Sequence, residues 1–193
     1  MNISWEGGKD SQRLDFSGTA SLHKTTLNIP LVKVVIAGDG NVGKTSLIRL
    51  FTQGKFNLSR VATIGVDFHT HTVQLPEGPV RLSIWDMAGQ ERFQFFRMDF
   101  YRGSRAAALV YDVTSPPSLE HLVDWRSEIS KVVADSKFVV VGNKVDLERA
   151  QDPVVARGFA AAIGASYLET SALTGQGVAE MFRTLAMLAT DEE

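Results

Sequence analysis

The sequence has no cysteine, no long apolar run and almost no net charge, and each absence excludes a class of function. Without cysteine, the chain has no disulfide, no cysteine metal site, no cysteine nucleophile and no thioether or thioester lipid anchor. No stretch approaches the roughly 18 apolar residues of a membrane-spanning helix, and Met1-Asn2 lacks the glycine that N-myristoylation requires. The net charge of -2 gives no reason for nonspecific nucleic-acid binding. We therefore expect no nucleic-acid partner and no direct lipid anchor in this chain.

What remains is the composition of an ordinary soluble domain. Apolar residues make up 44% of the chain and charged residues 22%, values typical of globular proteins. A length of 193 residues corresponds to about one domain. Residues 1–30 are polar and rich in Ser, Thr and Gly, without the apolar segment of a signal peptide. We expect a flexible N-terminal extension over 1–30, one domain over 31–190, an acidic end over 191–193, and a cytoplasmic protein.

Six segments predict strands, and the spacing between them predicts an α/β fold. Five are short apolar runs; the sixth alternates and then meets the turn Pro-Glu-Gly-Pro, which predicts a hairpin with that strand on the sheet edge. Helical spacing fills most of the gaps, including a segment from Leu119 to Val133. Three layers are therefore expected, with about five helices covering a six-stranded, mostly parallel sheet that has one antiparallel edge strand. The predicted strands are 31–37, 66–75, 80–85, 106–113, 138–142 and 166–168.

Directly after the first predicted strand comes GDGNVGKT, residues 38–45, which matches G-x-x-x-x-G-K-[ST] in the required strand-to-helix context. Glycines let backbone N–H groups wrap around phosphate oxygens, Lys44 can bridge the β- and γ-phosphates, and the Thr45 hydroxyl can ligate Mg²⁺. A purely structural glycine turn is the alternative, and the lysine and threonine at these positions argue against it. The predicted phosphate-binding residues are Gly40, Asn41, Val42, Gly43, Lys44, Thr45 and Ser46.

A second motif, Asn143-Lys144-Val145-Asp146, follows the fourth apolar run. There the carboxyl end of a parallel strand places it near the base of a nucleotide bound by the glycine-rich loop. The Asp146 carboxylate can accept hydrogen bonds from guanine N1–H and the 2-amino group, whereas adenine offers no such pair of donors. Alone, this motif is a common surface turn. Downstream of the phosphate motif it predicts a guanine site.

With these motifs in place the chain resembles the small GTPases, and within them the Rab family. The likeness covers about residues 31–189 and rests on GDGNVGKT, TIGVDF, IWDMAGQERF, YRGS, YDVT, NKVDL and ETSAL in that order. It implies the P-loop NTPase G domain, with GTP or GDP and Mg²⁺ bound at the carboxyl edge of the sheet. It also implies a GTP hydrolase that works as a switch in vesicle traffic or membrane-linked signalling.

The resemblance assigns further site residues. It implies that Thr63 and Asp86 join Thr45 around Mg²⁺, that the Gly89 N–H contacts the γ-phosphate, and that Gly40 leaves space beside it. Gln90 resembles the residue that orients the attacking water, with Lys44 and Thr63 completing the catalytic set. The guanine base is expected to contact Phe56, Asn143, Lys144, Asp146, Ser171, Ala172 and Leu173, with Ser171 and Ala172 as backbone donors to O6.

Catalysis of this kind depends on positioning and charge stabilisation. Because no arginine finger is evident in cis, we expect turnover on the order of 10⁻⁴ to 10⁻² per second until a partner donates one. The resemblance implies an exchange factor, a GTPase-activating protein and effectors that contact residues 54–68 and 85–101. It matches Phe68, Trp85 and Phe100 to an aromatic trio that effectors read. A core role for individual Phe residues is the alternative, and we favour a surface that partners contact. We expect a monomer.

Three departures from the family pattern leave alternatives open. Met87 stands where threonine is usual, and Leu173 replaces the usual lysine over the base. They are the support for an alternative function, a guanine-nucleotide-binding scaffold with little or no hydrolysis. The chain ends in an acidic tip where Rab proteins are typically prenylated on cysteines, so we expect either a shortened chain or recruitment to membranes by partners. A P-loop kinase or ATPase is a third interpretation, which NKVDL and WDMAGQ disfavour.

Overall fold

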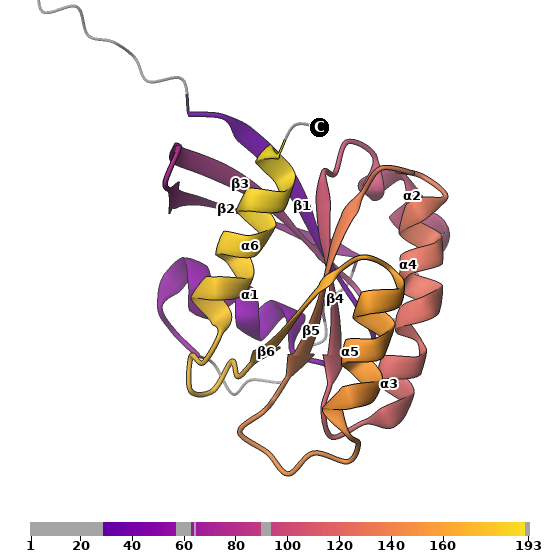
Figure 1. Cartoon of the computed structure of the whole chain (residues 1–193). Coiled ribbons are helices and arrows are strands. Elements are labelled where there is room, and N and C mark those ends of the chain that lie inside the picture. The colour runs from indigo at the N-terminus through magenta and orange to yellow at the C-terminus, as the bar shows by residue number, and fades with distance from the viewer. Residues whose placement is uncertain (1–28, 57–62, 64, 90–93, 192–193) are drawn as a thin grey trace, which may run out of the picture.

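The computed structural model describes residues 29–56, 63, 65–89 and 94–191. Strands and helices alternate along most of this length (Figure 1). The strands are β1 Leu31–Ala37, β2 Val66–Leu75, β3 Gly78–Met87, β4 Ala106–Asp112, β5 Lys137–Asn143 and β6 Ser166–Thr170. The helices are α1 Lys44–Gln53, α2 Gln94–Tyr101, α3 Pro116–Glu120, α4 Leu122–Ser130, α5 Pro153–Ala162 and α6 Val178–Thr190.

The six strands form one sheet in the order β2-β3-β1-β4-β5-β6. Every neighbouring pair is parallel except β2 and β3, which form an antiparallel hairpin at one edge. The predicted mixed sheet with one antiparallel edge strand is thus confirmed. Since β1, β3, β4 and β5 run in the same direction, their carboxyl ends lie along one edge and can contribute to a shared site.

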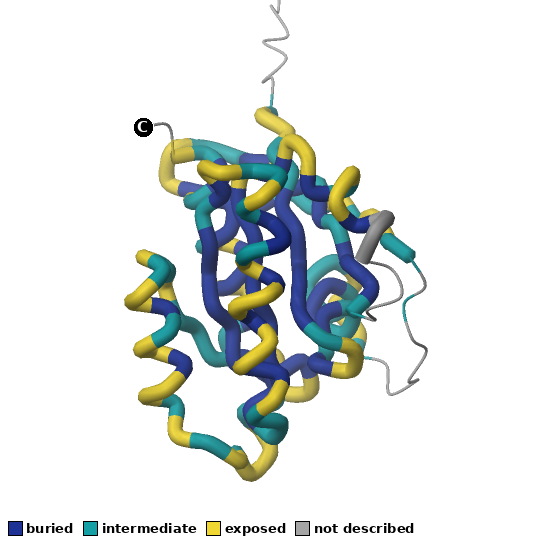
Figure 2. The backbone as a smooth tube through the Cα atoms, turned by 90° about the vertical axis from the view of Figure 1, so that its right-hand side faces the viewer, coloured by how far each residue is buried: buried dark blue, intermediate teal, exposed yellow. Residues whose placement is uncertain are grey.

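Alternating side chains of each central strand enter two separate cores. In β1, Val34 and Ile36 face a core formed with α1 and α6, whereas Val35 and Ala37 face a second core formed with α2 to α5. Figure 1 shows α1 and α6 together on one face of the sheet and α3, α4 and α5 on the other. The central strands are buried along their lengths, while each helix is buried on one side only (Figure 2). Burial on both faces explains why these strands read as continuous apolar runs.

The helical segment predicted between Leu119 and Val133 is divided in the structure. A short α3 begins with Pro116-Pro117, His121 lies at the junction, and α4 ends at Ser130. Val132 and Val133 lie beyond that end, where both of their N–H groups donate to the Ile129 carbonyl in a tight turn. Their apolar side chains still pack against the second core, so the spacing was correct as a core pattern and wrong as a helix boundary.

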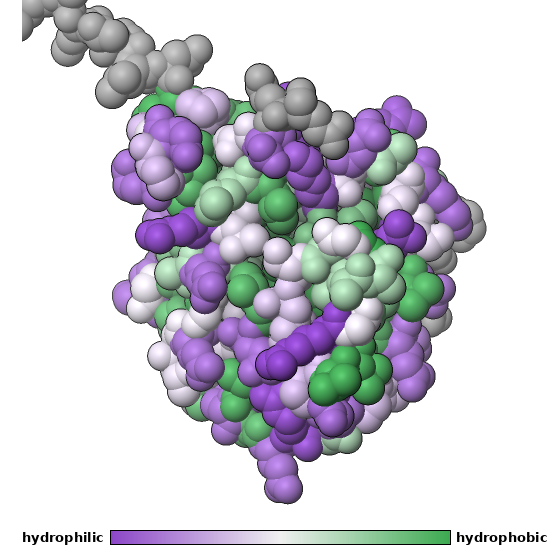
Figure 3. Space-filling model, viewed as in Figure 1, coloured by the Kyte–Doolittle hydropathy of each residue, from purple (hydrophilic) through white to green (hydrophobic). Residues whose placement is uncertain are grey.

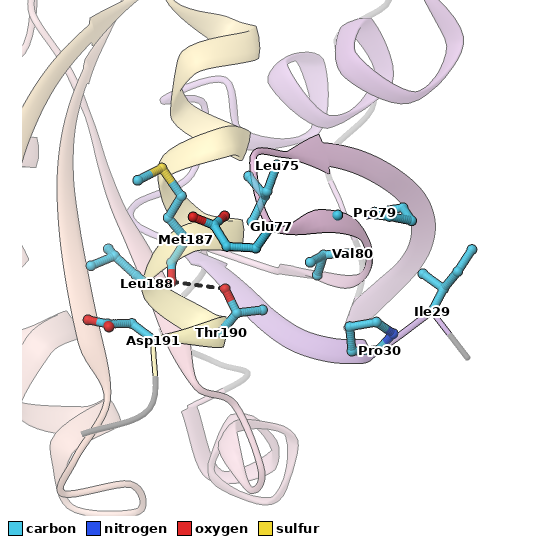
Figure 4. A pocket seen from close by; sticks show the side chains of 11 residues that line it. Ile29, Pro30, Leu75, Glu77, Pro79, Val80, Met187, Leu188, Thr190 and Asp191 are labelled. Carbon is cyan, nitrogen blue, oxygen red and sulfur yellow. Dashed lines mark hydrogen bonds between the residues drawn. The ribbon is translucent and has the colours of Figure 1, made fainter. Parts of the chain in front are cut away.

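The surface away from the strand ends carries few features. Polar and apolar side chains are mixed on the face seen in Figure 3, with a small apolar patch near the start of α5, where Val154 and Val155 are exposed. A groove of about 690 Å³ lies at the amino ends of β1 and β3, between the β2–β3 turn and the end of α6 (Figure 4). It contains none of the predicted site residues. Within the described residues, no helix has both the length and the apolar composition needed to span a bilayer.

Candidate functional site

The glycine-rich segment links the end of β1 to the start of α1 and closes on itself. The Lys44 ammonium donates hydrogen bonds to the carbonyls of Gly38 and Asp39, at 2.6 and 2.7 Å. Gly43 has φ 100°, and a Cβ there would lie 2.3 Å from the Asn143 amide nitrogen, so a larger residue would both strain the backbone and clash. The loop therefore has the curled backbone that the phosphate motif predicts.

Lys44 is buried, with 6% of its surface exposed. Burial lowers the pKa of Lys44 to about 8, and the nearby carboxylates of Asp86 and Asp39 oppose this shift. A buried ammonium is costly unless it is paired. A phosphate at this position would supply the negative charge that favours the protonated lysine.

Three oxygen-bearing side chains meet beside the glycine-rich loop. The hydroxyls of Thr45 and Thr63 lie 2.8 Å apart, and Thr45 donates to Asp86 Oδ2 at 2.5 Å. Asp86 is fully buried, and its Oδ1 has no hydrogen-bond partner among the described residues. Burial raises the pKa of this carboxyl, with the Thr45 hydrogen bond and Lys44 acting in the opposite direction.

This cluster fits a magnesium ion. Mg²⁺ prefers oxygen ligands and commonly takes one or two carboxylates together with substrate phosphates. Asp86 would supply an unpartnered carboxylate oxygen, directly or through water, and Thr45 and Thr63 would supply hydroxyls. In the described parts of the chain, no three or more His, Cys, Asp or Glu side chains form a group that could hold a metal ion by themselves.

The predicted base-binding residues also come together. Asn143 at the end of β5 donates to the Val42 carbonyl at 2.8 Å and accepts from the Thr170 hydroxyl at 3.1 Å. Asp146 lies on the following turn, where its Oδ1 accepts a hydrogen bond from the Ser171 hydroxyl at 2.5 Å. The NKVD and ETSAL segments are thus joined to each other and to the phosphate loop.

The structure bears differently on the roles predicted for the individual residues of the NKVD and ETSAL segments. The Ser171 N–H donates to the Gln176 carbonyl at 3.0 Å, so in this structure it is already paired and the hydroxyl of Ser171 instead holds Asp146. Ala172 and the 56% exposed Leu173 follow it in the same turn. Lys144, in a left-handed conformation with φ 68°, contacts Asp112 Oδ2 at 2.5 Å. Phe56 is half-buried against the core under α1 and α6, and its contact with guanine stays a prediction.

The segment after β3 approaches the phosphate loop closely. A Cβ at Gly89 would lie 2.3 Å from the Asp39 carbonyl carbon and the Gly40 nitrogen, so only glycine fits here. At Gly40 a Cβ would meet nothing within 4 Å, and its place beside a γ-phosphate stays a prediction. Gln90 lies outside the described residues, and its predicted role is untested.

The aromatic trio lies on the surface beside this segment. Phe68 and Trp85 are direct neighbours across β2 and β3, with ring centroids 4.4 Å apart at 84°, and Phe100 of α2 lies 5.8 Å from Trp85. Phe68 is 54% exposed, whereas Trp85 and Phe100 pack partly against the second core. The trio is therefore both a core edge and an accessible surface. Its recognition by partners stays a prediction.

Sequence reasoning missed a link between the glycine-rich loop and the helices behind it. Asp39 accepts hydrogen bonds from Trp125 Nε1 at 2.9 Å, and its other oxygen lies 2.6 Å from His121 Nδ1. The only signal available was that a buried indole N–H needs an acceptor. A pairing across more than eighty positions cannot be read from local spacing.

Comparison with known proteins agrees with this geometry. A family model described as the Ras family matches residues 33–191. The chain is similar to "Ras-related protein Rab7" of Pisum sativum, at 46% identity over 166 residues, which is 81% of each chain. It is also similar to "Ras-related protein Rab-4" of Dictyostelium discoideum, at 43% over 155 residues, covering 79% of this chain and 76% of the relative. A third relative, "Ras-related protein RABA2a" of Arabidopsis thaliana, is 43% identical over 159 residues, or 80% and 73% of the two chains.

Proposed function

The chain belongs to the Ras family, and from that membership we propose how its residues bind GTP with Mg²⁺, hydrolyse it and pass the result to partners. It is a Rab-like small GTPase and a GTP hydrolase. One observation carries the proposal: Asn143 hydrogen-bonds both to Val42 of the phosphate loop and to Thr170 of the ETSAL segment. These two hydrogen bonds set the distance between the segments proposed to bind the base and the loop proposed to bind the phosphates.

We assign the base to the corner formed by Asp146 and Ala172. Asp146, held by the Ser171 hydroxyl, accepts from guanine N1–H and the 2-amino group, while adenine would leave this acid unpaired. Because the Ser171 N–H is paired with Gln176, the donor to guanine O6 is Ala172. Lys144 and Leu173 cover the base from outside.

The phosphates and the metal take the other half of the site. Lys44 and the N–H groups of the loop bind the phosphate oxygens, and Thr45, Thr63 and Asp86 hold Mg²⁺, which when bound neutralises charge on the β- and γ-phosphates. Gly89 donates its N–H to the γ-phosphate. Gln90 orients the attacking water, so hydrolysis removes the group that holds this segment in place.

The surfaces that depend on the γ-phosphate are the ones we propose partners contact. Exchange factor, activating protein and effectors bind residues 54–68 and 85–101, with Phe68, Trp85 and Phe100 as the aromatic contact. We propose a monomeric switch that serves vesicle traffic and reaches membranes from the cytoplasm through partners. Met87, which suggested a non-hydrolysing scaffold, is fully buried in the second core. The side chain of Met87 therefore packs in the core next to Asp86, and a scaffold with little or no hydrolysis stays the alternative that the phosphate-release measurement decides.

Nucleotide exchange followed by phosphate release tests the proposal. Loaded with GTP and Mg²⁺, the wild type should release phosphate slowly, and Gln90→Leu should be slower by at least about tenfold because the water loses its orienting group. Gln74→Leu, at an exposed position on β2, is the matched control and should hydrolyse like the wild type. Equal rates for Gln90→Leu and wild type, or displacement of bound GDP by ADP as readily as by GTP, would contradict it.

A further inference from the structure

The peptide unit between Ala88 and Gly89 is held on one side by a buried arginine. Arg97 of α2 donates a hydrogen bond from Nη1 to the Ala88 carbonyl at 3.2 Å, and the Ala88 N–H donates to the Gly65 carbonyl at 3.0 Å. A planar trans peptide places its C=O and the next N–H on opposite sides. Fixing the Ala88 oxygen therefore fixes the direction of the Gly89 N–H.

Arg97 is itself fixed in three directions. Its Nε and Nη2 donate to the two different carboxylate oxygens of Glu128, each at 2.9 Å, and its guanidinium carbon lies 4.1 Å from the centroid of the Trp125 ring. The Tyr101 hydroxyl donates to Glu128 at 2.7 Å. Arg97 and Glu128 are 4% and 8% exposed, so water competes little with these contacts.

The same cluster reaches the phosphate loop. Trp125, whose ring lies against the Arg97 guanidinium, donates its Nε1–H to Asp39. Gly89 packs against the peptide between Asp39 and Gly40, where a Cβ on Gly89 would lie 2.3 Å from the Asp39 carbonyl carbon. Helix α4 therefore contacts the phosphate loop through Trp125, and it contacts the Ala88–Gly89 peptide through Glu128 and Arg97. These contacts set the distance between the loop and that peptide.

Stability does not explain this arrangement. A buried ion pair costs desolvation free energy, and apolar side chains of similar volume are often equally stabilising. A guanidinium, by contrast, offers five donors in a rigid plane and can bind a carboxylate and a carbonyl at once. The property that the cluster adds is orientation of a backbone group.

We propose that Arg97, held by Glu128 and Trp125, is a positioning residue that aims the Gly89 N–H at the γ-phosphate and so sets the preference for nucleoside triphosphate over diphosphate. This inference rests on the proposed function, which places Gly89 at the γ-phosphate. GDP lacks that phosphate. The contact of Arg97 with the Ala88 carbonyl should therefore affect the affinity for the triphosphate and leave that for GDP unchanged.

The test compares the dissociation constants of GDP and of a non-hydrolysable β,γ-imido GTP analogue, both with Mg²⁺. In Arg97→Met the constant for the analogue should rise about tenfold, the size of one hydrogen bond to a charged group, while that for GDP stays unchanged. A purely structural role would weaken both nucleotides equally and leave their ratio unmoved. Arg102→Met is the matched control, since Arg102 is 77% exposed and lies 3.6 Å from Asp99; its ratio should equal that of the wild type.

A second variant keeps the test valid if the single variant fails to fold. Arg97→Met combined with Glu128→Gln removes both buried charges and keeps an amide oxygen for the Tyr101 hydroxyl, so it should fold and show the same tenfold change. An unchanged ratio in this double variant overturns the inference while GTP binding itself stands. A wild type that binds guanosine and adenosine nucleotides equally overturns the proposed function, and the inference with it.

Discussion

The side chain of His121, at the junction of α3 and α4, contacts Asp39 of the phosphate loop. Its Nδ1 lies 2.6 Å from Asp39 Oδ2. The hydrogen bond and charge of Asp39 raise the pKa of His121 above its usual 6.5, with smaller contributions from Asp124 and Glu120 and an opposing one from burial. The imidazole is 53% exposed, so solvent screens the pair and its effect on stability is small.

A histidine whose pKa is raised by folding stabilises the folded state while it is protonated. We expect this contribution to be complete below about pH 6.5 and to be lost as pH rises through the higher folded pKa. An NMR titration of the His121 ring should give a pKa above 6.5, and Asp39→Asn should return it toward that value. Asp124→Asn is the control and should shift it less. Titration at or below the usual value in the wild type would contradict the pairing.

At the scale of single residues, the sequence predicted what a motif dictates and missed what the fold brings together. Lys44, Thr45 and Asp146 were identified because their chemistry needs fixed spacing from glycines or from each other. The pairing of Asp39 with His121 joins residues 82 positions apart and follows from no local pattern. Likewise Ser171 was predicted as a backbone donor, but its N–H is turned to Gln176 by a local turn that sequence alone does not specify.

At the scale of elements, helix α5 shows a start that its sequence encodes fully. Asp152 precedes Pro153, and its side chain accepts a hydrogen bond from the Val154 N–H at 2.9 Å. Asp152→Ala should therefore lower the free energy of unfolding by about 1 kcal/mol, measured by urea denaturation with nucleotide and Mg²⁺ held constant. Asp152→Asn keeps a capping oxygen and should change it by only a few tenths of a kcal/mol. A similar loss in both variants would show that charge, rather than the cap, matters.

Element existence was predicted better than element length. The apolar runs identified all the parallel strands, and most clearly β4 and β5, where burial on both faces leaves little choice of residue. The hairpin turn was placed over residues 76–79, yet Gly78 and Pro79 belong to β3, where they pair with Leu75 and Gln74 of β2. Cross-strand pairing thus extended β3 through a proline, which is tolerated because Pro79 lies at the start of the strand, before the pairing with β1 begins at Arg81.

At the scale of the whole molecule, the site is assembled from segments distributed over most of the domain. The phosphate loop follows β1, Asp86 is the second-last residue of β3, Asn143 ends β5 and Ser171 follows β6. Parallel strand direction made this convergence predictable, because all four segments leave the sheet at the same edge. A ligand that bridges them contacts both halves of the sheet and binds only the folded chain.

Such a ligand should stabilise the entire domain. At free GDP 1,000 times its dissociation constant, with Mg²⁺, the free energy of unfolding should rise by about 4 kcal/mol, which raises the midpoint of thermal unfolding by about 8 to 16 °C for a domain of this size. Part of this gain comes from the unpartnered Asp86 Oδ1 and from Lys44, whose buried ammonium gains a phosphate. Removing Mg²⁺ with EDTA should therefore lower the midpoint measurably at constant GDP. ADP with Mg²⁺ is the matched control ligand, and an equal shift with ADP, or no response to EDTA, would contradict this account.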